Sequence, residues 1–141
     1  MATYANIRSK VQSTVYGILT ADSNVNTLAK IIDGTPKSLS KNRGAMITVN
    51  TPTTSDGNWV FTNDRFDQNI TLPITIYSRK ESVTRDIADA VINSLKTTQS
   101  ATRAEKIHKF RIKSTIMNPL ELESGDIIYT YTVNVGYNFV G

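Results

Sequence analysis

One histidine and a few groups of carboxylates are the side chains whose chemistry has to be considered first. His108 lies in the run KIHKF, and no acidic residue at a local spacing is suited to orient its ring. A general base needs such a partner, so we interpret His108 as a surface histidine on a basic strand. Serine and threonine are abundant, but no Gly-x-Ser-x-Gly elbow accompanies them, and nucleophilic catalysis is not predicted.

The carboxylates offer three groups of oxygen ligands, namely Asp64 with Asp67, Asp86 with Asp89, and Glu121 with Glu123 and Asp126. The first pair lies in a predicted turn, where aspartate commonly bonds the local backbone. The second pair is three residues apart on a predicted helix, which favours a solvated face. The third group, in ELESGD, misses the twelve-residue spacing and closing glutamate of a calcium loop. No metal site is predicted.

Cofactor sites are equally hard to place on this sequence. There is no cysteine, which excludes disulfides, thiolate catalysis and thiolate metal ligands. The seven glycines are scattered, and DGTPKS lacks the Gly-Lys-Ser/Thr ending that surrounds a phosphate in a P-loop. We therefore predict no cofactor and no enzymatic activity.

A basic cluster is the main electrostatic feature of the chain, and it consists of Arg103, Lys106, Lys109, Arg111 and Lys113 around a single Glu105. The last three alternate along a predicted strand and are expected to share one of its faces. Such a face can contact phosphate or an acidic protein surface. The alternative is a solvated strand whose lysines protect a sheet edge from aggregation, and we favour it because no exposed aromatics are interleaved for base stacking.

The composition is that of a folded domain. The chain has 141 residues, 39% of them hydrophobic and 20% charged, with a formal net charge of +4. This length suits one domain over residues 1–141. No window approaches the 18 or so apolar residues of a membrane span, and the N-terminus lacks the pattern of a secretory signal. Assembly in the cytoplasm and no membrane partner are therefore expected.

Hydrophobic spacing predicts two main helices. Apolar residues at three- and four-residue steps mark residues 3–20, and a second stripe at Val83, Ile87, Ala88, Val91 and Leu95 marks the other helix. Ser78 and Glu81 have the spacing of a capping box at its start, and Ser82 or Thr84 are alternative caps.

Strands are predicted from alternation. Residues 45–50 and 58–62 are expected to form a hairpin around a polar loop at 51–57, with a second turn at 63–68. In the next strand Ile70, Leu72, Ile74 and Ile76 alternate with polar positions, so one face should be buried. Pro73 requires an edge or a bulge there. A strand from about Phe110, a loop at 118–126 and a long final strand from Ile127 complete the chain.

Long strands with short connections at the end of the chain favour an α+β fold. We predict a mixed, mostly antiparallel sheet with the two main helices packed on one face. A doubly wound nucleotide fold is not predicted, because its strands and helices would alternate regularly after a glycine-rich turn.

The whole arrangement resembles the tail terminator, or tail-to-head joining, proteins of long-tailed bacteriophages and related viruses. The segments that carry the resemblance are VNTLAKIIDGTP, AMITVN, NWVFT, ITLPITIYSRKESVTRDIADAVINSL and IIYTYTVNVGYNFV, in that order. In that family a strand ending in an Ile-Tyr-Ser-like segment leads into a helix of the form Asp-Ile-x-x-x-Val-x-x-x-Leu. The matching positions here are Ile76, Tyr77, Ser78, Asp86, Ile87, Val91 and Leu95.

The resemblance implies a structural role in a virion. Such proteins form a homo-oligomeric ring, typically a hexamer, at the head-proximal end of the tail. The ring caps the tail tube, stops the tube protein from polymerising, and later docks to the head connector or neck protein. DNA passes through its lumen without specific binding.

A closed ring needs two different surfaces on each protomer that match each other. We expect one at the hairpin, with Trp59, Phe61, Arg65 and Phe66, and another at the basic face, with Lys109, Arg111 and Lys113. Opposite charge comes from Glu121, Glu123 and Asp126. The alternatives are another neck protein (a head-completion or connector-adaptor protein) and a small basic nucleic-acid-binding module.

Overall fold

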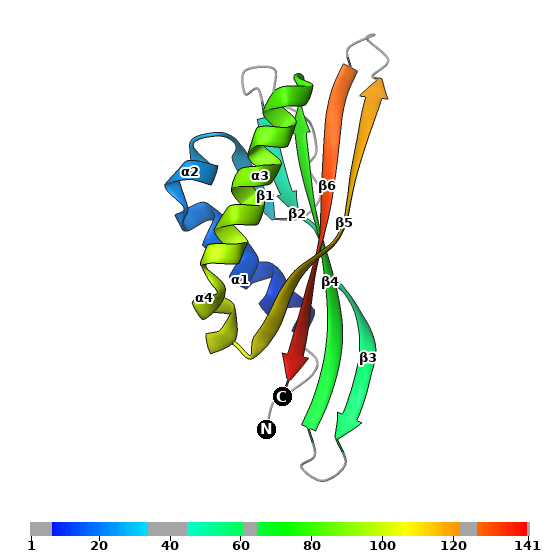
Figure 1. The fold of residues 1–141 in the computed structure, drawn as a ribbon. Helices are drawn as coiled ribbons and strands as arrows, with labels where there is room; N and C mark the ends of the chain where they lie inside the picture. Colours follow the sequence, from blue (N-terminus) through cyan, green and yellow to red (C-terminus); the bar gives the residue numbers. More distant parts are fainter. Residues whose placement is uncertain (1–6, 34–44, 61–64, 122–126, 141) are drawn as a thin grey trace.

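The computed structural model of the chain describes residues 7–33, 45–60, 65–121 and 127–140 (Figure 1). The helices are α1 (Ile7–Ala21), α2 (Ser23–Asn26), α3 (Glu81–Thr97) and α4 (Gln99–Ala104). The strands are β1 (Lys30–Asp33), β2 (Ala45–Val49), β3 (Thr53–Val60), β4 (Arg65–Ser78), β5 (Ile107–Glu121) and β6 (Ile127–Val140). None of the helices in these ranges is long and apolar enough to cross a membrane.

The strands form one mixed sheet. Its order is β1-β2-β4-β6-β5, with β3 pairing β4 beyond the end of β2. Only the β1–β2 pair is parallel among the described strands, and the others are antiparallel. The main helices α1 and α3 lie on one face (Figure 1). The predicted α+β class, with a mostly antiparallel sheet and helices on one face, is therefore confirmed.

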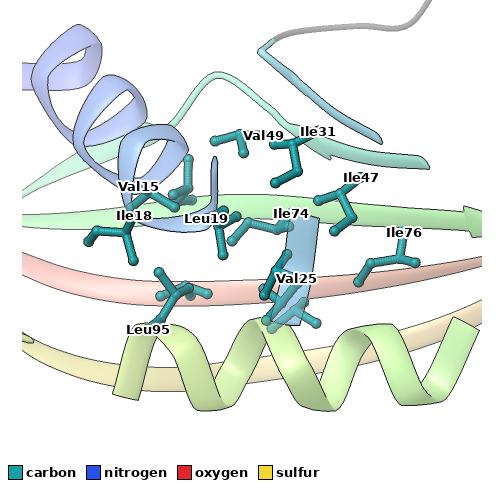
Figure 2. Close-up of a cluster of buried hydrophobic side chains, with 14 of the residues drawn as sticks. Val15, Ile18, Leu19, Val25, Ile31, Ile47, Val49, Ile74, Ile76 and Leu95 are labelled. Atoms are coloured by element: carbon teal, nitrogen blue, oxygen red, sulfur yellow. The ribbon is translucent and has the colours of Figure 1, made fainter. Parts of the chain in front are cut away.

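The core forms between this helical layer and the inner face of the sheet (Figure 2). Alternation places Ile74 and Ile76 of β4 inward, and both are fully buried. Val15 and Leu19 of α1 and Leu95 of α3 meet them from the opposite layer. Because both helices are amphipathic and β4 is central, hydrophobic burial holds the two layers together.

The predicted hairpin between residues 45–50 and 58–62 is wrong. β2 pairs antiparallel with β4, with Ala45 opposite Ser78, and β3 pairs with the other half of β4. The predicted polar loop at 51–57 is largely strand, since β3 begins at Thr53. The predicted turn at 63–68 is also too long, because β4 begins at Arg65. One long strand thus serves two successive partners, which local sequence patterns do not reveal.

Pro73 lies where β4 changes partners. The Pro73 carbonyl accepts a hydrogen bond of 3.0 Å from the Asn50 amide, just beyond the end of β2. A residue in a ladder directs its N–H and C=O to the same side, so the absent N–H also faces this gap between β2 and β3. β4 is a central strand, and its pairing with β6 passes Pro73 without a register shift. The proline is therefore accommodated by a junction between two partner strands, not by the edge or bulge we predicted.

The predicted capping box at the start of α3 does not form. The N-cap residue is Lys80, with no side-chain cap. The Ser78 hydroxyl instead accepts from the Lys80 amide at 3.2 Å, and the Thr84 hydroxyl donates to the Lys80 carbonyl at 2.9 Å. Ser78 therefore shapes the turn from β4 into α3 and does not act as a helix cap.

Replacing Tyr137 with phenylalanine is expected to stabilise the fold. Tyr137 is 1% exposed, and its hydroxyl has no hydrogen-bond partner among the described residues. An unsatisfied buried hydroxyl costs about 1–3 kcal/mol, so Y137F should raise the free energy of unfolding by roughly 1 kcal/mol. Urea denaturation checks this, with Tyr77→Phe on the more exposed face of β4 as the control.

The same substitution is expected to change alkaline stability. Burial raises the pKa of Tyr137 far above its usual range. In the unfolded chain a tyrosine ionises near about pH 10. The contribution of the protonated Tyr137 to the free energy of unfolding is therefore fully present below that pH. It is lost as the pH rises above it, because only the unfolded chain releases the proton. In Y137F this part of the loss should be absent, and an unchanged slope above pH 10 would contradict the assignment.

Candidate functional site

The helix-free face of the sheet is polar. Here β4 presents Asn69, Thr71 and Thr75, opposite Asn138, Gly136 and Thr132 of β6. The Thr75 hydroxyl lies 3.3 Å from the Thr132 hydroxyl. It accepts a hydrogen bond of 3.1 Å from the side-chain amide of Asn50. Asn138 donates to the Asn69 side chain at 2.9 Å. Side-chain hydrogen bonds therefore run across this face and join β4 to β6 and to the end of β2.

Two residues of the predicted basic face are bound to this polar network. The Arg111 guanidinium donates to the Asn138 side chain at 2.7 Å and to the Lys109 carbonyl at 3.0 Å. The Lys113 ammonium donates to the Thr71 hydroxyl at 2.8 Å. Both side chains lie over Gly136, where a Cβ would come within 3.0 Å of Arg111 and 3.1 Å of Lys113. The glycine makes room for the two cations to lie along the sheet.

The expectation of simple alternation along this strand is wrong. The pairing of β5 with β6 shifts between His108 and Arg111 and again between Ile112 and Ser114. Lys109 lies in the first irregularity with a positive φ of 58°, and its side chain is exposed. Bulges change which face a side chain uses. Arg111 and Lys113 therefore share a face of the sheet, while Lys109 lies in a bulge, outside the regular pairing of β5 with β6.

The acidic residues considered as partners of the basic cluster, together with Glu105 inside that cluster, lie in two places. Glu121 is exposed at the last position of β5, so the predicted loop at 118–126 begins with strand. Glu123 and Asp126 lie outside the described residues. Glu105, the acid within the basic cluster, pairs with Lys10 of α1 at 3.0 Å. That pair is solvent-exposed and contributes little to stability.

The predicted aromatic surface lies on the hairpin of β3 and β4. Trp59 of β3 is opposite Phe66 of β4, and Val60 is opposite Arg65. Phe61 lies outside the described residues. The hairpin of β3 and β4 extends well past the helical layer at one end of the sheet (Figure 1). Trp59, Arg65 and Phe66 are therefore brought together at this end of the sheet.

Sequence reasoning missed the exposed edge of the sheet at β5. Ile112 is 37% exposed and Ile116 is 50% exposed on this strand. In the described part of the chain β5 pairs with β6 alone. The available signal is the apolar residue at each of these positions in a polar stretch, but the loop predicted at 118–126 ends the strand before Asn118, whereas β5 continues to Glu121.

The start of α3 is the place where an α/β enzyme would hold its chemistry. A hollow of about 340 Å³ lies here, lined by Leu28, Ala45, Ser78, Arg79, Lys80 and Val83. It contains no carboxylate, histidine or cysteine. Across the described ranges no group of three or more histidine, cysteine, aspartate or glutamate residues could hold a metal ion.

Replacing Arg111 with methionine tests the structural role of this cation. Asn138 is 6% exposed and receives its short hydrogen bond from Arg111. Removing a charged donor from a buried acceptor costs about 1–3 kcal/mol, and R111M should lower the free energy of unfolding by that amount. Lys109→Met is the matched control in urea denaturation, and its exposed side chain should contribute less than about 0.5 kcal/mol. Equal effects of the two substitutions would contradict this role.

Comparisons with known proteins relate the chain to solved structures. No family model matches the chain, and no curated protein matches it. Among solved structures, a chain from the virion of the native gene transfer agent (GTA) particle is similar, with a TM-score of 0.59 and 14% sequence identity. The match covers 99% of this chain and 100% of that one. The chain thus shares its whole fold with a component of that virion.

Proposed function

We propose that this chain is a structural protein of a phage-like virion, with no enzymatic role. The observation that carries the proposal is the match of fold over the full length of a virion chain. The polar face of the sheet is compatible with this role, because its described side chains bond to one another across the strands and so stabilise the sheet.

Within the virion we propose that the chain is a tail terminator, formed as one domain over residues 1–141. A ring of copies, with six as the expected number, caps the head-proximal end of the tail tube and stops its growth. The ring then docks to the head connector or neck protein, and DNA passes through its lumen without specific binding. This finer assignment is supported by the sequence segments that resemble the terminator family, above all the strand and helix from Ile70 to Leu95.

The contacts of such a ring involve the surfaces named above. We propose that the hairpin with Trp59, Phe61, Arg65 and Phe66 contacts one neighbour in the tail. The exposed cations Lys109 and Lys113, next to Arg111, contact an acidic surface such as that of Glu121, Glu123 and Asp126. Charge reversal at Lys109 and Lys113 should then change the oligomer mass in light scattering.

Two alternatives have different signatures. Connector adaptors of the neck tend to be dominated by helices, whereas the long strands β4, β5 and β6 dominate this fold. A nucleic-acid-binding module would use the basic strand, but Arg111 and Lys113 bond to the sheet. In a titration with duplex DNA, a binder would lose affinity steeply with rising salt, whereas a terminator should bind weakly at all salt concentrations.

The experiment that tests the role is arrest of tube growth. Tail tube protein is polymerised with and without the chain, and tube lengths are measured by electron microscopy. A terminator shortens and narrows the length distribution at a ratio of about one ring per tube. Tubes of unchanged length at saturating amounts of the chain would contradict the terminator assignment.

A further inference from the structure

The second half of β5 is an open sheet edge. From Ser114 to Glu121 the pairing with β6 is regular, and both irregularities lie before Ser114. The lysines that commonly protect an edge, Lys109 and Lys113, also lie before it. In this half Ile116 is 50% exposed. From Ser114 to Leu120 this edge is regular, partly apolar and carries no charged residue, which makes it a template for pairing with another strand.

The hydrogen bond of the Pro73 carbonyl in β4 determines, strand by strand, which way the N–H and C=O groups of β5 point. In an antiparallel ladder, successive residues direct their N–H and C=O groups to alternate sides. The Pro73 carbonyl bonds the Asn50 amide on the β2 side, so Thr75 also faces β2. Its partner in β6, Thr132, then directs its groups away from β4 and toward Ile116 of β5. Ile116 therefore faces β6.

Thr115 and Met117 consequently direct their N–H and C=O groups outward, away from the sheet. Pro119 falls on the same outward side by the same alternation. A proline is tolerated there because its missing N–H removes no bond from the ladder with β6. The edge is thus closed at Pro119, while it is open at Thr115 and Met117.

The opposite edge of the sheet, β1, has matching groups. Thr48 of β2 faces Thr75, so its neighbour Ile47 faces β1. In a parallel ladder Ile47 bonds the residues on either side of its partner Ile31. Ile31 and Asp33 therefore direct their own N–H and C=O groups outward. In the described part of the chain β1 pairs with β2 alone.

The two edges lie at the same level of the sheet. One row of Cα partners runs through Ile32, Thr48, Thr75, Thr132 and Ile116, and the next runs through Ile31, Ile47, Ile76, Tyr131 and Met117. β1 is parallel to β2 and hence antiparallel to β5. A second copy displaced sideways by the width of the sheet therefore brings its β1 next to β5, and the two strands are antiparallel. The outward N–H and C=O groups of that β1 then face the outward N–H and C=O groups of β5.

We propose that residues 115–117 of β5 pair antiparallel with residues 31–33 of β1 in a second copy of this chain. Thr115 stands opposite Asp33 and Met117 opposite Ile31 as hydrogen-bonded pairs, while Ile116 stands opposite Ile32. The inference rests on the proposed ring and names its contact. Because two different edges meet, repetition of the contact yields a closed ring, or a filament if the rotation does not close.

Disulfide cross-linking of the full chain tests this register. The chain has no cysteine of its own, so Ile32→Cys combined with Ile116→Cys introduces the only two. In the proposed pair their Cα atoms are about 4.5 Å apart, within reach of a disulfide. Within one copy they lie at opposite edges, four strand spacings or roughly 19 Å apart. Mild oxidation should give a ladder of covalent oligomers that ends at the size of the ring.

Controls separate the contact from random collision. An equal mixture of the two single variants should give dimers only, and Ser100→Cys on α4 combined with Ile116→Cys should give no ladder. Light scattering of the unmodified chain is measured in parallel. Oligomers in solution without a 32–116 ladder would overturn the edge pairing and leave the ring standing. A chain that is monomeric at every concentration, gives no ladder and adds no density to tube ends would overturn both.

Discussion

Replacing Ile74 with alanine is expected to lower the free energy of unfolding by about 2–5 kcal/mol. Ile74 is fully buried on β4, the central strand of the sheet, and both α1 and α3 contact this strand. The substitution removes three carbon atoms from the meeting point of the two layers, and the surrounding side chains cannot collapse from both sides at once. The loss therefore includes the cavity as well as the lost transfer free energy.

Urea denaturation followed by circular dichroism measures this loss. Ile116→Ala is the matched control, because the same atoms are removed from a residue that is 50% exposed. At a concentration where the chain is monomeric, the control should cost less than about 1 kcal/mol. If Ile74→Ala cost no more than Ile116→Ala, the two-layer core would not be organised around β4 as described.

Replacing Thr115 with proline is expected to raise the concentration needed for assembly at least tenfold while the monomer stays folded. Its N–H points outward in the alternation set by Pro73, so the ladder with β6 loses no donor. The five-membered ring of the introduced proline side chain replaces the N–H, which removes one hydrogen bond from the proposed contact, and it adds bulk where the second copy approaches. Light scattering over a concentration series measures assembly, and the unfolding transition reports on the fold.

Two matched comparisons make this result specific. Thr115→Val keeps the N–H and should assemble as the original chain does. Ile116→Lys places a charge on the edge and should weaken assembly, whereas Ile127→Lys, at a residue of similar exposure in β6, should not. Normal assembly of both T115P and I116K would rule out β5 as the contact.

The parts of the fold that local patterns determine were predictable. The alternation of β4 and the apolar stripe of α3 identify the buried faces directly, since burial follows the period of each element. The first part of β3 was missed because TPTTSDG is polar and resembles a loop, whereas its last residues fall in the strand predicted at 58–62. Its partner, and that of β2, depend on pairing between distant segments, which no local period encodes.

The candidate site was less predictable for a related reason. The basic residues were recognised by charge, but the bulges that separate Lys109 from Arg111 and Lys113 depend on the partner strand. The acceptor of Arg111, Asn138, lies 27 positions away in the sequence. The open edge at residues 115–117 follows only from the order of all the strands, because an edge is a property of the whole sheet.

Electron microscopy of the purified chain mixed with tail tubes tests the central claim most directly. The account predicts closed rings of uniform size, seen as added density at one end of each tube and absent from tubes alone. Class averages of the rings should show a fixed rotational symmetry, with six as the expected number of copies. Tubes with bare ends, together with a chain that forms no rings at any concentration, would contradict the account.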